Sequence, residues 1–176
     1  CRIEPENNVH VILEAFSQQD DTSLVIVGNW LNSAYGRGLR EKYSSHNGFY
    51  LLDSIYELGK LKKLRSDAAI YIHGHSAGGT NPSLVEAMHF GVPVVAFDCD
   101  FNRSTTEGKA LFFRDAESLQ QVLFSHTEGE LEDVGKDMIE IARRRYTWDK
   151  VAEQYFELFS DGVLKSIWST DWKNYY

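Results

Sequence analysis

Short runs of apolar residues alternate with helical patterns along the first two thirds of this chain, and this order limits the folds open to it. The run Leu24–Val27 is continuous and is closed by Gly28, and similar runs recur at 68–72, 93–97 and 110–113. Continuous apolar strands separated by helices are typical of a parallel sheet that is buried on both faces. We therefore expect an α/β fold in which helices cover both faces of a parallel sheet.

Helical patterns separate these strands and fill the last third of the chain. Thr147 is a good N-cap for the closing helix. A further strand is expected at 49–52, whereas the polar stretch 36–47 has no clear period and is predicted to be mainly loop. The helices expected from apolar spacing are 9–16, 55–64, 82–90, 119–123, 134–141 and 151–159.

Charge and cysteine content exclude several classes of protein. The 176 residues include 18 Lys+Arg and 26 Asp+Glu, which gives a formal net charge of −8. Nucleic acid and anionic membranes repel an acidic chain that has no basic run. Cys1 and Cys99 are too few for a disulfide framework or a four-thiolate zinc site, so we expect a cytoplasmic protein. No apolar stretch approaches the roughly 20 residues of a membrane-spanning helix.

Most of the chain is expected to form one domain, over 1–160, because its length suits a single core and no linker rich in Pro and Gly divides it. The chain begins at Cys1 and not at a methionine, so we expect it to be a piece of a longer polypeptide. An aromatic tail over 161–176 is expected either to dock on a missing part or to fold onto this domain. Its large apolar residues are Ile167, Trp168, Trp172, Tyr175 and Tyr176.

The segment 75–88, between a buried strand and an amphipathic helix, carries the strongest functional signal. Gly78 and Gly79 let the backbone approach a ligand, Asn81 is a good N-cap, and the proline after it suits the first helical position. The free N–H groups of such a helix start attract a phosphate. Glu86, one turn further on, could accept hydrogen bonds from a sugar hydroxyl. The simpler alternative is a capped helix that follows a glycine turn.

The motifs of this chain resemble, in their order, the C-terminal, donor-binding half of the retaining family 4 glycosyltransferases. The run 83–88 followed by 91–96 resembles their nucleotide-sugar signature, and 2–8 resembles their Gly-Arg loop. The segments 106–113 and 146–152 are similar to their late glutamate loop and to the start of their closing helix. The resemblance implies a Rossmann-like domain of a GT-B enzyme, and the sequence of residues 2–8 is most similar to a bacterial rhamnosyltransferase-like branch.

The resemblance also implies roles for individual residues. Arg2 matches the arginine that meets the donor diphosphate; the alternative is a surface ion pair with a neighbouring glutamate, Glu4 or Glu6. Glu86 matches the glutamate that holds the nucleotide ribose. Glu107 is expected near the donor or, equally, as a solvated loop acid. The expected donor-binding residues are Arg2, His75, Gly78, Gly79, Thr80, Asn81, Glu86 and Glu107.

Two positions depart from the family pattern. Gly78, eight residues before Glu86, stands where the family has its first glutamate, and Asn7, five residues after Arg2, stands where it has a lysine. These changes remove a cation from the expected diphosphate site and a partner for sugar hydroxyls. We expect a deoxy sugar, a different nucleotide or a loss of activity to accompany them. His75 could contact the donor in place of either residue.

The function implied is transfer of a sugar such as rhamnose, with retention, from a nucleotide diphosphate sugar to a saccharide acceptor in bacterial surface polysaccharide synthesis. The acceptor site and the catalytic residues would belong to a missing N-terminal half. The full-length protein would lie at the inner face of the membrane, and no metal or other cofactor is expected. The chain by itself is expected to bind donor weakly and to transfer nothing. The alternatives are a non-catalytic nucleotide-sugar module or scaffold and, more distantly, a flavodoxin-type regulatory domain with Asp98 as acceptor.

Three further patterns are open to two interpretations. His73 and His75 could form a metal-ligand pair, but the barrel and the later ligands of such hydrolases are missing. Asp98 and Asp100 match an Asp-x-Asp metal motif, yet they are expected rather to cap a loop or to bond Arg103. The aromatic residues of the closing helix are expected in the core or at an interface. They are Trp148, Tyr155, Phe156 and Phe159.

Overall fold

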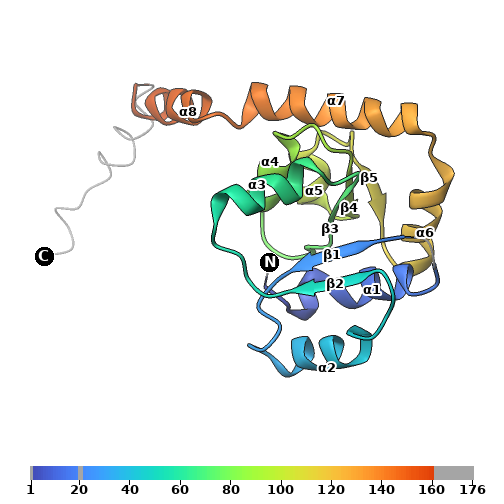
Figure 1. Cartoon of the computed structure of the whole chain (residues 1–176). Coiled ribbons are helices and arrows are strands. Elements are labelled where there is room, and N and C mark those ends of the chain that lie inside the picture. Colours follow the sequence, from blue (N-terminus) through green and yellow to red (C-terminus); the bar gives the residue numbers. More distant parts are fainter. Residues whose placement is uncertain (1, 20–21, 161–176) are drawn as a thin grey trace, which may run out of the picture.

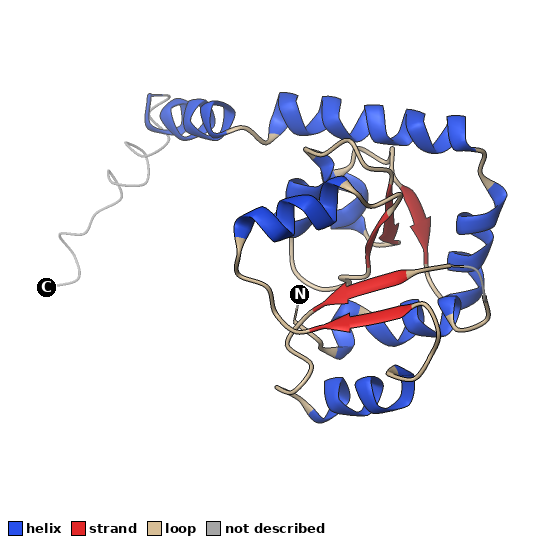
Figure 2. Ribbon diagram, in the orientation of Figure 1, coloured by secondary structure: helices blue, strands red, loops and turns tan. Residues whose placement is uncertain are grey.

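Parallel strands between layers of helices make up the computed structural model, which describes residues 2–19 and 22–160 (Figures 1 and 2). Strands β1 (Leu24–Val27) and β2 (Phe49–Leu52) pair in parallel. Strands β3 (Tyr71–His73), β4 (Val94–Phe97) and β5 (Leu111–Phe113) form a second parallel sheet in that order. The expected α/β fold is confirmed, but its described strands form two sheets instead of one.

Helices flank the strands on both faces (Figure 1). On one face α1 packs against α6, and on the other α4 packs against α7. The helices are η1 (Pro5–Asn7), α1 (Val9–Phe16), α2 (Ala34–Tyr43), α3 (Leu58–Ser66), α4 (Pro82–Met88), α5 (Asp100–Thr105), α6 (Ala116–Ser125), α7 (Glu128–Arg145) and α8 (Trp148–Ser160).

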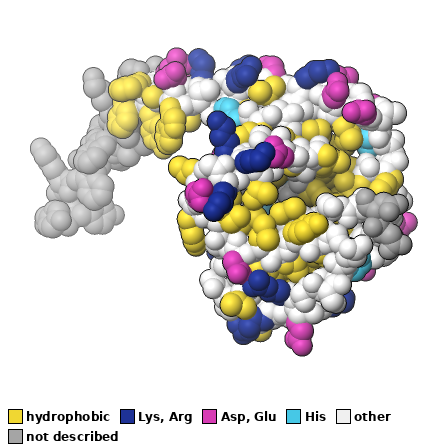
Figure 3. Space-filling model, in the orientation of Figure 1, with side chains coloured by type: hydrophobic (Ala, Val, Ile, Leu, Met, Phe, Trp, Pro, Cys, Tyr) yellow, Lys and Arg dark blue, Asp and Glu magenta, His cyan; other side chains and the backbone are white. Residues whose placement is uncertain are grey.

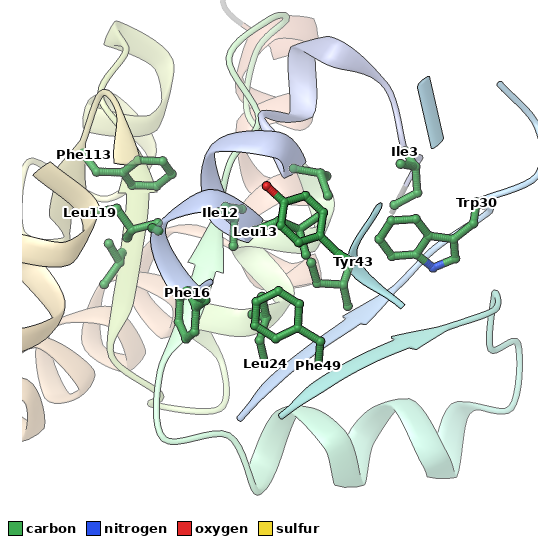
Figure 4. Packing of buried hydrophobic residues seen from close by; sticks show 14 residues of the cluster. Ile3, Ile12, Leu13, Phe16, Leu24, Trp30, Tyr43, Phe49, Phe113 and Leu119 are labelled. Carbon is green, nitrogen blue, oxygen red and sulfur yellow. The ribbon is translucent and has the colours of Figure 1, made fainter. Parts of the chain in front are cut away.

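Two hydrophobic clusters lie on the two sides of the strands. The larger one joins α1 and α6 to strands of both sheets, and Figure 4 shows Phe16 of α1 between Leu119 and Leu24. Trp30 is fully buried at one end of this cluster, where its indole N–H donates to the carbonyl of Leu52 at 2.9 Å. The second cluster packs α4 and α7 on β4. Its buried members are Leu84, Met88, Val94, Ala96, Ala110, Met138, Ile141 and Ala142.

Several helix starts follow from local side-chain chemistry. Asn81 accepts a hydrogen bond from the N–H of Ser83 at 2.9 Å, and Thr147 accepts one from the N–H of Lys150 at 3.3 Å, so both expected caps are confirmed. Thr127 and Glu130 bond each other's backbone N–H groups in a capping box that starts α7.

The prediction of a loop over 36–47 is wrong, because α2 occupies most of it. Ser33 caps this helix by accepting from the N–H of Gly36 at 3.1 Å. A Cβ on Gly36 would lie 2.5 Å from the carbonyl oxygen of Trp30, so glycine allows the close approach. Gly36 and Gly38 lower helix propensity and hid the helix from the sequence pattern. The short α5 was missed as well, while β3 and α3 begin later than expected.

The expectation that Leu24–Val27 is buried on both faces is also wrong. Val25 is 46% exposed, and Tyr50 on the neighbouring strand is 54% exposed. The apolar residues of α8 do not join the core: Trp148 is 88% exposed, and Phe156 is also exposed. The interface role of α8 stays a prediction, as does the boundary at 160. The aromatic tail over 161–176 lies outside the described residues.

The packing of α7 on the turn after α4 gives a stability test. A Cβ on Gly135 would overlap the carbonyl oxygen of Gly91, whereas a Cβ on Gly129, in the same helix, meets nothing within 4 Å. We expect Gly135→Ala to lower the free energy of unfolding by about 1–3 kcal/mol because two backbones must separate. Gly129→Ala should leave stability unchanged or raise it by up to about 1 kcal/mol. Urea titrations of both variants check this, and equal stabilities would contradict the packing.

Candidate functional site

Two segments far apart in the sequence meet where β1 and β3 end. The N–H of Ser76 donates to the carbonyl of Glu6 at 2.8 Å, and the Asn8 amide donates to the carbonyl of Gly74 at 2.8 Å. A Cβ on Gly74 would overlap the carbonyl oxygen of Asn7, so the contact requires glycine. Residues 2–8 are thereby held beside the loop that carries the glycine motif.

Three residues singled out by the sequence lie together at this contact. His75 Nδ1 is 2.6 Å from Asn7 Oδ1. Since an amide oxygen can only accept, this bond assigns the ring proton to Nδ1. The other ring nitrogen, Nε2, lies 3.6 Å from the position that a Cβ on Gly78 would take. Both departures from the family pattern, Asn7 and Gly78, therefore adjoin His75.

The glycine loop presents backbone donors at the surface. Gly78, Gly79 and Thr80 are exposed, and their backbone N–H groups form no hydrogen bond within the part of the chain that is described. Gly78 has a φ of +107°, a conformation that favours glycine. Asn81 then caps α4. A short row of unpaired amides before a helix start is suited to an anion.

Asn102, which sequence reasoning missed, positions this loop. It is fully buried in α5, and its amide nitrogen donates to the carbonyls of His75 and Phe97, at 2.9 Å in each case. One side chain thus ties the loop after β3 to the end of β4. The sequence gave no signal for this role, because one asparagine in a short helix does not reveal which carbonyls it reaches. These carbonyls belong to residues 27 and 5 positions earlier in the chain.

Asp98 is engaged by arginines. Its two oxygens accept from Arg103 Nε at 2.5 Å and from Arg114 Nε at 2.9 Å, so the expected bond to Arg103 is confirmed. Hydrogen bonds from Arg103 and then Arg114 hold the pKa of this carboxyl below its usual range. No group of three or more His, Cys, Asp or Glu side chains among the described residues could hold a metal ion.

Glu86 lies on α4 and faces α3. Its carboxylate is 2.8 Å from the Arg65 guanidinium, and its side chain remains 56% exposed while that of Arg65 is 20% exposed. The carboxylate is therefore accessible to a ligand, but a ligand would have to share it with Arg65.

Arg2 and Glu107 lie in different surroundings. Arg2 is exposed and forms no ion pair with Glu4, Glu6 or any other described residue. Glu107 follows α5 and precedes β5, so it does not lie in a loop after a strand. Its oxygens pair with Arg144 at 2.7 Å and Arg145 at 3.1 Å, at the end of α7, and the bond from Arg144 chiefly lowers its carboxyl pKa. The structure does not link Glu107 to the glycine loop.

His73, at the end of β3, is buried beneath this site. It is 5% exposed, its Nε2 has no partner among the described residues, and burial lowers its pKa to about 4. The rings of His73 and His75 are 6.0 Å apart, and the nearby His75 lowers the pKa of His73 further. His73 is therefore neutral at physiological pH.

The buried His73 makes stability depend on pH. Between pH 6.5 and about 4 the unfolded chain binds a proton on this residue that the folded chain does not, so stability is lost as the pH falls. We expect a loss of about 3 kcal/mol across this range that is absent in His73→Leu. Urea unfolding at several pH values measures it. The exposed His89→Gln is the control, and an identical slope in wild type and His73→Leu would refute the assignment.

Comparisons with known proteins agree with this architecture. The chain aligns with solved structures of Anabaena Alr3699/HepE in complex with UDP-glucose (TM-score 0.78, 18% identity, 91% of this chain and 47% of that one). It also aligns with sucrose-phosphate synthase from Thermosynechococcus elongatus (TM-score 0.78, 20% identity, 93% of this chain and 44% of that one). A third match is the C-terminal domain of a glycosyl transferase group 1 family protein, LpcC, from Francisella tularensis (TM-score 0.68, 12% identity, 84% of this chain and 83% of that one).

The first two alignments show that the chain spans about half the length of these solved structures. They establish the α/β fold with parallel sheets flanked by helices found in GT-B glycosyltransferases. No curated protein sequence matches the chain. The described residues contain no helix that is both long and apolar enough to cross a bilayer. The family model "Glycosyl transferases group 1" matches residues 1–129, and the chain therefore belongs to this glycosyltransferase family.

Proposed function

We propose that this chain is the donor-binding half of a retaining glycosyltransferase and that its donor is a nucleotide diphosphate sugar. The observation that supports the proposal is the packing of residues 2–8 against the loop 74–81, because Arg2 and the unpaired amides then belong to two segments in contact. HepE, whose fold the chain shares, was solved in complex with UDP and with UDP-glucose. Family membership supports the reaction class.

In this proposal the protein stabilises the leaving diphosphate by electrostatics. The N–H groups of Gly78, Gly79 and Thr80 donate to phosphate oxygens, and Arg2 supplies a cation. Such donors act strongest where charge develops as the sugar leaves. No metal is needed for this step.

His75 takes the place of the two family residues that the chain lacks. Asn7 accepts from His75 Nδ1 and so orients the ring, which leaves Nε2 near Gly78. A Cβ on Gly78 would only touch this nitrogen, at 3.6 Å, but the φ of +107° at Gly78 disfavours a glutamate there. The donor therefore meets an imidazole where other members of the family present a lysine and a glutamate, and a deoxy sugar such as rhamnose suits a site with one carboxylate fewer.

The whole protein would then act in the cytoplasm, at the inner face of the membrane, on a saccharide acceptor of a bacterial surface polysaccharide. The acceptor and the remaining catalytic groups would lie in the other half of the protein. This chain by itself would bind donor weakly and transfer nothing.

The second candidate is a non-catalytic nucleotide-sugar module, which the absence of the family lysine and glutamate at Asn7 and Gly78 favours. Sugar transfer by the full-length protein would dispose of it.

Titration calorimetry with a series of nucleoside diphosphates tests the donor site. We expect one of them to bind and Glu86→Gln to weaken binding roughly tenfold to hundredfold, because a charged hydrogen bond to the ribose is lost. Arg65→Met removes the ion pair but keeps the carboxylate, so it should bind normally. Glu107→Gln tests whether Glu107 contacts the donor. Binding of none of the nucleotides, or an unchanged affinity in Glu86→Gln, would overturn the proposal.

A further inference from the structure

Buried polar residues gather near the glycine loop, which spans residues 75–80. Four polar residues are buried within 2–19 and 22–160, and they are His73, Asn102, Thr105 and Thr106. His73 ends β3, and the other three lie in α5 or directly after it. Because a buried polar group costs free energy unless it is hydrogen-bonded, the partners of these side chains explain why α5 carries them.

Asn102 holds the start of the glycine loop. Its amide nitrogen donates to the carbonyls of His75 and Phe97, at 2.9 Å in each case. Since carbonyls only accept, the amide oxygen must point away from both, and this oxygen is buried with no partner in the described part of the chain. An unpaired buried acceptor costs free energy, so what this side chain contributes is its two donated bonds.

Thr105 meets the other end of the glycine loop. Its hydroxyl donates to the carbonyl of Phe101 at 2.7 Å, and its oxygen lies 3.4 Å from the hydroxyl oxygen of Thr80. One short helix therefore contacts the loop at both ends. Gly78 and Gly79 lie between the two contacts and remain exposed.

The end of α7 fixes the C-terminal end of α5. The Tyr146 hydroxyl donates to the carbonyl of Thr105 at 3.1 Å, and Arg145 donates to the carbonyl of Ser104 at 3.0 Å. The last carbonyls of a helix have no partner within it, so these bonds hold α5 without competing with its own hydrogen bonds. Asn102 and Thr105 thus reach the glycine loop from an element that is itself anchored.

In the proposed donor site, the glycine loop meets a diphosphate with little help from side-chain charge. The chain has a net charge of −8, and Figure 3 shows Lys and Arg side chains of one face in small groups, many of them beside Asp or Glu. Backbone N–H groups carry no net charge, so they attract an anion only where they converge on it. The conformation of the loop would then decide the affinity.

We propose that α5 is a clamp for the glycine loop and that Asn102 and Thr105 are positioning residues for the donor diphosphate. This inference rests on the proposed donor site. Gly78 and Gly79 allow the free loop many backbone conformations, whereas a diphosphate needs the amides in one of them. A loop that is held at both ends loses less entropy when the ligand binds, so the clamp raises affinity without touching the ligand.

Two ligands separate this positioning role from a general loss of structure. In the full-length protein, a nucleoside diphosphate would meet the loop through its phosphates, whereas the corresponding nucleoside lacks them. We expect Asn102→Asp, which keeps the shape of the side chain but cannot donate, to weaken the diphosphate roughly 5-fold to 100-fold and to leave the nucleoside unchanged. Calorimetry measures the diphosphate, and NMR titration measures the nucleoside.

Thr105→Val provides a second variant, because Asn102→Asp buries a carboxylate and could unfold the protein. It should weaken the diphosphate in the same selective way, by less than Asn102→Asp does. Thr106→Val is the matched control: Thr106 is equally buried, but its hydroxyl donates to the backbone carbonyl of Asn102 at 2.8 Å, within the same helical turn. This control should bind both ligands normally.

The glycine loop also gives a measurement that needs no ligand. Backbone amide relaxation by NMR reports motion faster than nanoseconds at Gly78 and Gly79. We expect this motion to increase in Asn102→Asp and in Thr105→Val and to match the unaltered protein in Thr106→Val.

Equal loop motion in all variants would overturn the clamp, as would equal weakening of the diphosphate and the nucleoside. If no nucleotide binds to the unaltered protein, the proposed donor site fails, and loop motion alone then decides whether α5 holds the loop. The two failures are therefore distinguishable.

Discussion

The close contact between residues 2–8 and the loop after β3 is the interaction on which the candidate site depends. It is made of the backbone hydrogen bond from Ser76 to Glu6, of the bond from the Asn8 side chain to the carbonyl of Gly74, and of Gly74 itself, against which the carbonyl of Asn7 lies. Backbone contacts of this kind place two loops with little freedom, since any added Cβ must push them apart. Asn7 and His75 come together because of this contact, although 68 residues separate them in the sequence, and the Asn7 side chain also donates to the carbonyl of Arg2.

Electrostatics follow from the same arrangement. The chain is acidic, and most of the arginines near its candidate site are already neutralised: Arg65 by Glu86, Arg103 and Arg114 by Asp98. An anion would therefore be met chiefly by backbone donors, which carry no net charge and are oriented by the fold. The ion pairs leave the exposed Arg2 as a cation with no ion-pair partner in the described chain.

Structural features that depend only on residues close together in the sequence could be predicted. The caps at Asn81 and Thr147, the continuous run Leu24–Val27 and the Asp98–Arg103 bond each depend on neighbours within about five residues. Structural features that depend on partners far away in the sequence were missed. Helix α2 forms against Trp30 despite its glycines, and Asn102 was not recognised because its role lies in the carbonyls that it reaches.

The sequence by itself determined the order of the strands and of most helices, the glycine loop and the family, because local propensity and ordered motifs carry that information. The tertiary structure decided which charges are paired, which faces are covered and how the strands divide. Glu86 meets Arg65, Glu107 meets the end of α7, and Val25 is exposed although its run reads as buried. These outcomes depend on which elements lie side by side, since burial and charge pairing are properties of neighbours in space.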